Sequence, residues 1–259
     1  MKVSIITIAY NSGSTIEDTI KSVVAQDYPN IEYIIIDGAS KDNTLEIVER
    51  YRDRIAVVVS ERDKGIYDAM NKGAKLATGE ILGFLNADDF YASNKILSLV
   101  AGIFKDSTIE VCFGDLQYVD RNSTQKVLRH WKSGPFVPGR FASGWAPPHP
   151  AFFVRRSVFE SAGGFNTNYK LASDNDLMMR ILECRAHKSK YLQEVLVKMR
   201  VGGETNKSLF NIVRGNREIL KALQANGIKA NMWMFLLRKA GLKINHHLAG
   251  LLRNQPMAA

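Results

Sequence analysis

The sequence Val3-Ser-Ile-Ile-Thr-Ile-Ala-Tyr-Asn11 begins with a continuous apolar-rich run, Val3 to Ala9, which predicts a strand with apolar residues on both faces. The polar residues Tyr10 and Asn11 follow it. A strand that is apolar on both sides is typical of a parallel sheet covered on both faces. Three more apolar segments follow, at residues 31–36, 57–59 and 80–85, and helical patterns separate them. The first hundred residues therefore predict an α/β fold, in which helices cover both faces of a mostly parallel sheet.

Two of the expected helices begin with polar signatures. The run Ser14-Thr-Ile-Glu17 has the form of a capping box, in which the serine and the glutamate each accept a backbone hydrogen bond at the start of the helix. Asn43 and Glu46 repeat this spacing before the second helix. A third helix is expected over residues 66–77, where apolar residues recur at helical spacing.

The pattern changes after residue 110. Short segments indicate antiparallel strands at residues 111–113, 116–119 and 126–131. Residues 133–150 form a loop that holds five of the seven prolines, and a loop of this length without periodicity is more often functional than idle. A helix is expected to begin near Asp174, and a strand is expected over residues 191–199.

The composition is that of a folded globular chain. Of the 259 residues, 46% are hydrophobic and 24% are charged, which excludes a disordered tail, a fibrous repeat and a disulfide-rich miniprotein. Cys112 and Cys184 lie too far apart for a zinc motif, and the first residues lead into a strand without an apolar signal segment. We therefore expect reduced thiols and a cytoplasmic, uncleaved chain.

The charge is unevenly distributed. The formal net charge is +9, yet residues 1–100 hold 11 Lys and Arg against 15 Asp and Glu, whereas residues 201–259 hold 9 against 2. A basic C-terminal region suggests an anionic partner, such as a phosphorylated ligand, a membrane surface or nucleic acid. A solubilising face explains any single lysine equally well.

The tail holds two helical patterns. Residues 207–226 are amphipathic, and Met232-Trp-Met-Phe-Leu-Leu237 is apolar nearly all round. Basic residues flank the second pattern at Arg238, Lys239, Lys243, His246, His247 and Arg253. The apolar segment is shorter than the roughly 20 residues that span a bilayer. It is either an interfacial helix on an anionic membrane, which we favour, or a helix packed on its own domain or a partner.

Acidic residues gather where the chemistry of such a sheet is expected. Ligands bind beyond the carboxyl ends of parallel strands, and Asp37, Asp88 and Asp89 each follow a predicted strand. Because three carboxylates at one edge repel each other, we expect Asp88 and Asp89 to hold a divalent cation that bridges a diphosphate. The alternative is that they cap the helix that follows.

Two neighbouring side chains have similar alternatives. Asp37 can accept hydrogen bonds from a nucleoside or can shape the Asp-Gly turn, and Tyr10 can stack on a base or pack over the sheet. The chain has no GxGxxG motif after the first strand and no GxxxxGK[ST] motif, so phosphate loops of these kinds are disfavoured. Metal and side chains are therefore expected to hold the diphosphate.

The motifs taken together resemble those of family 2 inverting glycosyltransferases with the Rossmann-like GT-A fold. The first half of the resemblance rests on Ile5-Ile-Thr-Ile-Ala-Tyr-Asn11, Asp37-Gly-x-Ser40, Asp63-Lys-Gly65, Ala69-Met-Asn-Lys-Gly73, Thr78-Gly-Glu80 and Leu85-Asn-Ala-Asp-Asp89. The second half rests on His149-Pro-Ala-Phe-Phe-Val-Arg-Arg156, Gly163-Gly-Phe165 and Ser173-Asp-Asn-Asp-Leu177 followed by Arg180. The resemblance extends from residue 1 to about residue 200.

The resemblance implies a role for each matching residue. The residues implied in binding the donor, most often a uridine diphosphate sugar, are Tyr10, Asn11, Asp37, Asp63, Lys64 and Asp88. Asp88 and Asp89 fall in the motif that binds Mn²⁺ or Mg²⁺, although Asn86 stands where many members have the first aspartate of that motif. His149 is a further candidate ligand, or an acceptor contact, or a rigid loop residue. Asp174 matches the catalytic base, and its alternative role is a helix cap.

The implied organisation has three parts. Residues 1–105 form the nucleotide-sugar-binding half of the domain, residues 106–205 form its mixed acceptor-binding half with the catalytic base, and residues 206–259 form basic amphipathic helices. The expected enzyme is non-processive, since the chain has no QxxRW motif. It extends a glycan or a polyprenyl-diphosphate-linked acceptor in surface polysaccharide biosynthesis, at the inner face of the cytoplasmic membrane.

Two other functions are weighed against this one. A nucleotidyltransferase that makes the nucleotide sugar has the same fold, but the first loop, Asn11-Ser-Gly-Ser, has no basic residue. A nucleic-acid-binding protein would use the basic second half of the chain, and the acidic first half disfavours it. We therefore expect no nucleic acid among the partners.

Overall fold

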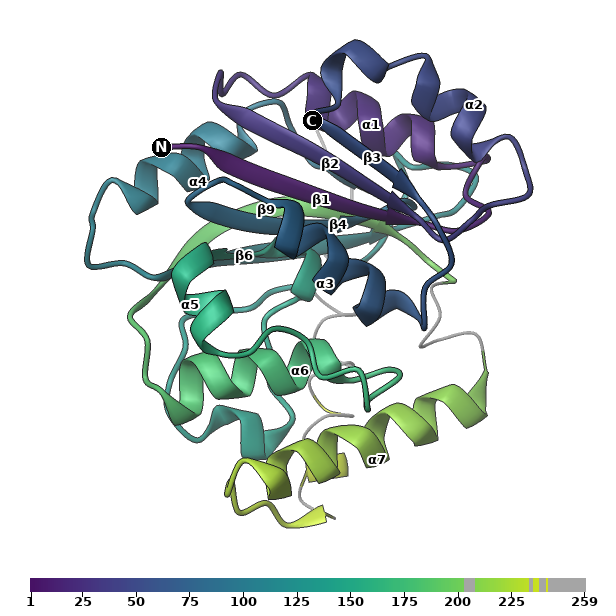
Figure 1. Cartoon of the computed structure of the whole chain (residues 1–259). Coiled ribbons are helices and arrows are strands. Elements are labelled where there is room, and N and C mark those ends of the chain that lie inside the picture. Colours follow the sequence, from purple (N-terminus) through teal and green to yellow (C-terminus); the bar gives the residue numbers. More distant parts are fainter. Residues whose placement is uncertain (203–207, 233–234, 238–240, 242–259) are drawn as a thin grey trace, which may run out of the picture.

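A computed structural model describes residues 1–202, 208–232, 235–237 and 241. Its centre is a nine-stranded mixed sheet in the order β3-β2-β1-β4-β8-β6-β9-β5, with β7 paired to β6 (Figure 1). The first four strands are parallel, and they are β1 (Val3–Ala9), β2 (Ile31–Asp37), β3 (Val57–Ser60) and β4 (Ile81–Asn86). The parallel strands predicted from the first hundred residues are confirmed.

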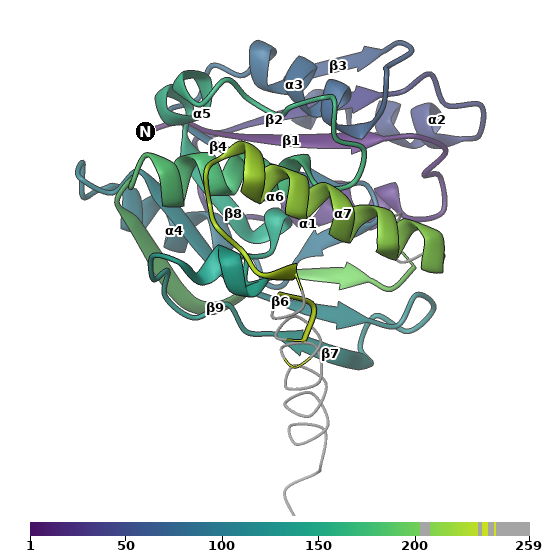
Figure 2. The ribbon, with the colours of Figure 1, turned by 90° about the horizontal axis from the view of Figure 1, so that it is seen from below.

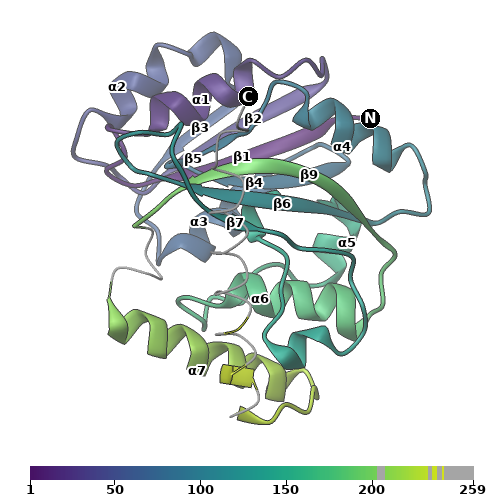
Figure 3. The same cartoon turned by 180° about the vertical axis from the view of Figure 1, so that it is seen from behind.

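The second half of the chain continues the same sheet. β8 (Phe152–Arg155) runs antiparallel to β4 and to β6 (Val111–Val119), while β6 is parallel to β9 (Ser189–Arg200). Figure 3 shows β6 and β9 side by side across the back of the molecule. β5 (Asp89–Tyr91) pairs with the end of β9, and β7 (Val127–Trp131) is the antiparallel partner of β6. Residues 86–89, called the acidic motif below, therefore connect β4 to β5 at one edge of the sheet.

Helices cover both faces of the sheet, as predicted (Figures 1 and 2). One face carries α1 (Ile16–Val24), α2 (Thr44–Glu49) and α4 (Ile96–Phe104). The other carries α3 (Ile66–Leu76), α5 (Arg156–Ser161), α6 (Ser173–Met178), which continues as a π-helix over Met179–Cys184, and α7 (Leu209–Ala225). Short 3₁₀ helices occur at Arg52–Arg54, Arg140–Ser143 and His149–Ala151.

Alternate residues of β1 supply the two cores. Ile5 packs with Ile16 under α1, and Ile6 packs with the α3 side of the sheet, because successive side chains of a strand point to opposite faces. Gly73 allows α3 to come very close to the sheet, since a Cβ atom there would lie 2.4 Å from the Ile6 side chain. This contact fixes α3, whose first residues lie beside the candidate site.

Three local predictions were wrong or incomplete. Ser14 does not cap α1: the helix has Thr15 at its N-cap with no side-chain cap bond. Asn43 is the N-cap of α2, yet Asp42, not Asn43, accepts the hydrogen bond from the Thr44 amide. The two strands expected at residues 111–119 are one strand, β6.

The apolar segment of the tail lies partly within the described residues. Phe235 is fully buried in the core beneath the sheet, whereas Met232 and Leu237 are exposed. This burial favours a segment packed on its own domain over the predicted interfacial helix. The basic residues Arg238, Lys239, Lys243, His246, His247 and Arg253 lie outside the described residues. No helix among the described residues is long and apolar enough to cross a membrane.

Glu32 joins the start of the sheet to the end of α3, and its loss is expected to destabilise the fold. Its carboxylate accepts hydrogen bonds from the Ser4 hydroxyl (2.6 Å) and from the Thr78 amide (2.7 Å) and hydroxyl (2.6 Å). Burial raises the pKa of Glu32, but these bonds and the charge of Lys2 outweigh it, so the pKa lies below its ordinary value of 4.5. We expect Glu32→Gln to lower the free energy of unfolding by about 1–3 kcal/mol at neutral pH.

The pH dependence of this effect checks its cause. A group whose pKa is lowered by folding stabilises the protein above its unfolded pKa and loses that contribution as the pH falls through the lowered value. Urea denaturation of the two proteins at several pH values should therefore show the difference shrinking below pH 4.5. A difference that stays constant into strong acid would contradict an electrostatic origin.

Candidate active site

The carboxyl ends of β1, β2 and β4 meet at one edge of the sheet. Ala9 lies opposite Asp37, and Ile8 lies opposite Asn86. Since neighbouring strands are about 4.8 Å apart, the residues that follow these three strands lie close together. They form two groups, one around Gly38 and one in a cavity.

The first group consists of Tyr10 and Asp63 above Gly38. A Cβ atom at Gly38 would lie 2.7 Å from Asp63 Oδ2 and 3.3 Å from Tyr10 Cδ2, so the glycine makes room for both. The Tyr10 side chain is 64% exposed, and the other oxygen of Asp63 accepts a hydrogen bond from the Gly65 amide at 2.8 Å. An exposed ring beside a carboxylate suits a planar ligand that offers hydrogen-bond donors.

Asp37 lies beneath this group and is fully buried. Its carboxylate accepts hydrogen bonds from the Ser40 amide (3.0 Å), the Ser40 hydroxyl and the Ser60 hydroxyl (2.7 Å). Hydrogen bonds from two serines therefore stabilise the Asp37 carboxylate at this edge. Asp37 holds the turn that carries the group, and its direct contact with a nucleoside stays a prediction.

Asn11 and Lys64 frame the same group. Asn11 has a positive φ of 48°, and its Oδ1 accepts a hydrogen bond from the Lys41 amide at 2.9 Å, which ties the β1 loop to the β2 loop. Asparagine is among the residues that tolerate this conformation. Lys64 is exposed, and its amide donates to Asp68 at 2.9 Å, which orients the loop before α3.

The second group lies in a cavity of about 300 Å³ whose lining includes Asn86, His149 and Asp174. Ile66 and Tyr67, the first residues of α3, line it as well, so the loop that carries Asp63 leads directly into the cavity wall. The cavity thus brings together the end of β4, the proline-rich loop and the start of α6. Tyr10, Asn11, Asp37 and Asp63 are not part of its lining.

The two adjacent aspartates of the acidic motif have different environments. Asp89 is fully buried, and its Oδ2 accepts a hydrogen bond from Asn86 Nδ2 at 3.1 Å. Burial raises the pKa of Asp89 well above its usual range, and the charge of Asp88 raises it further. Asp88 is partly exposed, and its backbone carbonyl accepts a hydrogen bond from Arg200 at 2.8 Å. Of the two carboxylates, only that of Asp88 belongs to a residue with access to solvent.

Several buried polar atoms at this edge have no hydrogen-bond partner, namely Asn86 Oδ1, Asp89 Oδ1 and His149 Nε2. Unpartnered buried oxygen and nitrogen atoms are costly unless a ligand or cation satisfies them. Carboxylate and carbonyl oxygens suit Mg²⁺ and Mn²⁺, and a neutral imidazole is a common metal ligand. Within the described part of the chain, however, no three His, Cys, Asp or Glu side chains are grouped as a metal site.

His149 is held by aromatic rings. It stacks on Phe84 with a centroid distance of 5.8 Å, and its edge meets Phe165 at 5.5 Å. Burial lowers the pKa of His149 from its usual 6.5, and the charge of Asp174 only partly opposes this shift. The imidazole is therefore neutral at physiological pH, which is the form that can bind a metal.

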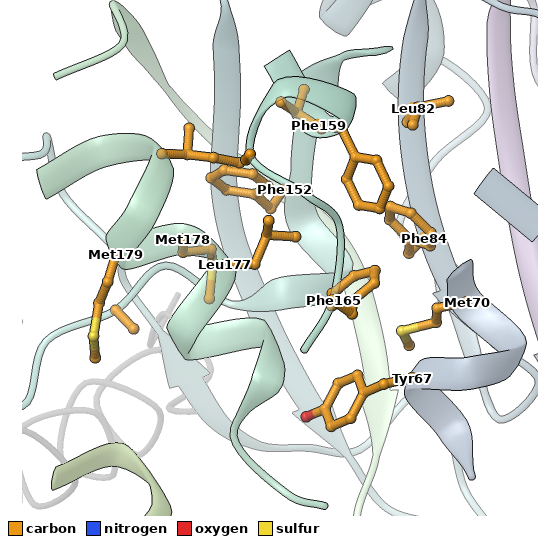
Figure 4. Close-up of a cluster of buried hydrophobic side chains, with 14 of the residues drawn as sticks. Tyr67, Met70, Leu82, Phe84, Phe152, Phe159, Phe165, Leu177, Met178 and Met179 are labelled. Atoms are coloured by element: carbon orange, nitrogen blue, oxygen red, sulfur yellow. The ribbon is translucent and has the colours of Figure 1, made fainter. Parts of the chain in front are cut away.

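Asp174 lies in the first turn of α6 and contacts Tyr67 in the lining of the cavity. Its Oδ1 accepts hydrogen bonds from the Tyr67 hydroxyl (3.1 Å) and from Asn175 Nδ2 (3.3 Å). Burial, and then the charge of Asp174, raise the pKa of Tyr67 well above 10, so this hydroxyl remains a donor at any physiological pH. Figure 4 shows the Tyr67 ring beside Phe165 and Met70, at the edge of the buried cluster that fixes it.

Several residues of the site were not among those predicted from the sequence. Tyr67 precedes the Ala69–Gly73 motif, and that position was the only signal for it. Arg200, at the end of β9, is buried and donates to Asp18 and to the Asp88 carbonyl. The cavity is also lined by a stack on β6 and β7 that joins Tyr118, Arg129 and Trp131, with the Arg129 guanidinium 3.9 Å from the Tyr118 ring centroid.

Comparisons with known proteins match this architecture. The family model of glycosyl transferase family 2 matches residues 4–191. A PGL/p-HBAD biosynthesis glycosyltransferase of Mycobacterium bovis is 28% identical over 224 residues, which are 85% of this chain and 83% of the relative. An uncharacterized glycosyltransferase of Mycobacterium tuberculosis is 32% identical over 183 residues, which are 69% of this chain and 68% of the relative.

Solved structures agree on the fold. Staphylococcus aureus TarS in complex with UDP-GlcNAc superimposes with a TM-score of 0.69 at 20% identity, over 99% of this chain and 77% of that one. A mannosyltransferase of Pyrobaculum calidifontis in complex with GDP-Man and Mn²⁺ gives a TM-score of 0.65 at 20% identity, over 100% and 76% of the two chains. The GT-A fold predicted for the chain is confirmed, and the matched residues include both groups at the sheet edge. The chain belongs to glycosyl transferase family 2 and is a glycosyltransferase.

Proposed function

We propose that this enzyme transfers a sugar from a nucleoside diphosphate sugar to an acceptor hydroxyl, with inversion at the anomeric carbon and with Asp174 as the base. The observation that carries the proposal is the position of Asp174. Its carboxylate lines the cavity together with Asn86 and His149, and Tyr67 and Asn175 hold it in place. A base held on the acceptor side is what a direct displacement requires.

The set of charged groups in the cavity supports inversion. Among the described residues that line it, Asp174 is the only acidic side chain. A retaining double displacement needs a second carboxylate to act as nucleophile, whereas a single displacement needs one base. In the proposed step the acceptor oxygen attacks the anomeric carbon, its proton passes to Asp174, and the nucleoside diphosphate leaves from the opposite side.

The donor is expected to lie across both groups. Tyr10, Asn11, Asp37, Asp63 and Lys64 are proposed to surround the nucleoside, with Asp37 acting through the turn that it holds. Asp88 is proposed to meet the diphosphate end, because the motif that carries it joins the nucleoside group to the cavity. In the structures of TarS and of the mannosyltransferase, the bound donors are UDP-GlcNAc and GDP-Man.

A divalent cation, Mn²⁺ or Mg²⁺, is proposed to bind at Asp88, with Asp89 and His149 as the further candidate ligands. The unpartnered Asn86 Oδ1, Asp89 Oδ1 and His149 Nε2 support this assignment, and Mn²⁺ accompanies GDP-Man in the mannosyltransferase. The cation would neutralise the charge that develops on the leaving diphosphate. The burial of Asp89 favours Asp88 as the direct ligand.

The acceptor is proposed to enter along the Tyr118–Arg129–Trp131 stack. The aromatic faces suit a sugar ring, and Arg129 suits a phosphate, since no ion pair joins it to a carboxylate of the described residues. These features favour a polyprenyl-diphosphate-linked glycan over a neutral one. The proposed role is therefore non-processive extension of a surface polysaccharide or glycolipid at a membrane surface.

A panel of UDP-sugars and GDP-sugars tests the proposal. The cognate donor should stabilise the full chain against thermal unfolding, by about 2.7 kcal/mol at 100 times its Kd, and should be hydrolysed slowly without an acceptor. The anomeric configuration of a transfer product, read by NMR, should be inverted. No stabilisation by any donor, or a retained configuration, would overturn the proposal.

Tyr67→Phe is expected to lower kcat by roughly tenfold while leaving the KM for the donor unchanged. The variant removes one hydrogen bond to a charged carboxylate, worth about 1.5–3 kcal/mol, and keeps the ring that packs on Phe165. Tyr191→Phe is a matched control, because it removes a similar bond, 2.8 Å long, to Asp115 outside the cavity lining. An equal loss of kcat in both variants would contradict the positioning role of Tyr67.

A further inference from the structure

The outer face of α7 combines exposed apolar side chains with cations. Phe210 is 73% exposed, the highest value among the large apolar side chains of the described residues, and Val213 is 57% exposed. Arg214, Arg217 and Lys221 are exposed at positions that continue the same face of the helix. An exposed apolar patch that polar or charged residues border marks an interaction site with a protein or a membrane.

A hollow of about 640 Å³ lies between this face and the loop after α5. Its lining is formed by the five residues of the face together with Asn166, Asn168, Tyr169 and Glu218. Glu218 is not a free anion: it pairs with Arg214 at 3.0 Å and accepts hydrogen bonds from the amides of Lys170 and Leu171. Arg217 and Lys221 have no ion pair with the described residues. The hollow therefore presents unbalanced positive charge beside an apolar rim.

The inner face of the same helix lies on the active site. Ile212, Gly215 and Ile219 line the cavity that contains Asp174. Figure 2 shows α7 lying across the side of the molecule that carries α6. The helix is thus a wall with the reaction cavity on one side and the cationic apolar face on the other.

We propose that this face of α7 docks on an anionic phospholipid membrane, with Phe210 and Val213 in the headgroup boundary and a lipid phosphate in the hollow beside Arg217 and Lys221. Apolar insertion and cationic attraction together are the two contributions that hold a peripheral helix on such a surface. The role of this docking rests on the proposed function, because the enzyme would reach a lipid-linked acceptor at a membrane. It assigns the contact to α7 in place of residues 232–237.

Cosedimentation of the full chain with lipid vesicles, without donor or acceptor, tests the docking. Binding is expected with vesicles of phosphatidylcholine and phosphatidylglycerol, weak with phosphatidylcholine alone, and lower at high salt. Phe210→Ser should weaken binding by roughly tenfold, since a buried Phe contributes about 1.5–3 kcal/mol. Arg217→Glu with Lys221→Glu should weaken it by more than about tenfold, at roughly 1 kcal/mol per charge.

Matched changes on α4 provide the control, because α4 lies on the opposite face of the sheet (Figure 1). Leu99→Ser and Lys105→Glu alter exposed residues at that helix and should leave vesicle binding unchanged. Equal binding to both vesicle types, equal loss in the control, or self-association through Phe210 seen by sedimentation without lipid would each overturn the proposal. Vesicle binding without donor hydrolysis would refute the proposed function and support the docking. Donor hydrolysis without vesicle binding would refute the docking and support the proposed function.

Discussion

Asp174→Asn is expected to lower the transfer rate by about 10²–10⁴-fold, the range that general base catalysis contributes. The amide keeps the shape of the side chain and can keep the Tyr67 hydrogen bond, but it cannot take the proton of the acceptor hydroxyl. The Kd for the donor nucleotide sugar should stay nearly constant, because Asp174 is proposed to act on the acceptor hydroxyl and not on the donor. Rapid-quench turnover and calorimetric titration of the donor measure the two quantities separately.

Asp176→Asn is the matched control for this experiment. Asp176 is buried, pairs with Arg180 at 2.9 Å and accepts a hydrogen bond from Asn226 at 3.0 Å, so it ties α6 to α7. Its loss should lower the thermal stability and leave most of the turnover. A large loss of donor affinity in Asp174→Asn, or turnover that survives in it, would refute the assignment of the base.

The sequence predicted those features that depend on local patterns. The apolar run at Val3–Ala9 matches β1 residue for residue, because a strand buried on both faces leaves little freedom in composition. The polar residues after β1, β2 and β4 lie at one edge because parallel strands end on the same side. Asp174 was found only through its resemblance to a family motif, since a carboxylate in a first helical turn is also an ordinary cap.

Features that depend on distant partners could not be predicted. Asp37 and Ser60 come from different strands, and no local pattern predicts the 2.7 Å hydrogen bond by which Ser60 stabilises the Asp37 carboxylate. Tyr67 and Asp174 are 107 positions apart in the sequence, and their side chains form a hydrogen bond. The burial of Phe235 depends on the core beneath the sheet, whereas its sequence neighbours alone suggested a membrane helix.

Asp88 and Asp89 are neighbours in the sequence, but their carboxylates lie in different electrostatic environments at the sheet edge. Asp89 is enclosed by protein and bonded to Asn86, while Asp88 has access to solvent and lies next to Arg200 through its carbonyl. The acidic residues at this edge therefore have three different environments: serine donors stabilise Asp37, Asp89 is buried, and Asp88 is partly exposed. The partial exposure of Asp88 is the reason why we propose this residue, and not the buried Asp89, as the direct ligand of a cation.

Removal of divalent cations is accordingly expected to lower transfer by about 10³-fold, since a bound cation contributes several kcal/mol at a leaving diphosphate. Dialysis against a chelator, followed by Mn²⁺ or Mg²⁺, should abolish and then restore turnover, and Asp88→Ala should not be restored. Asp89→Asn keeps the volume of a buried side chain and should retain most of the response to Mn²⁺. Full turnover in chelator would refute the metal assignment, whereas an equal loss of response in both variants would make Asp89 a direct ligand beside Asp88.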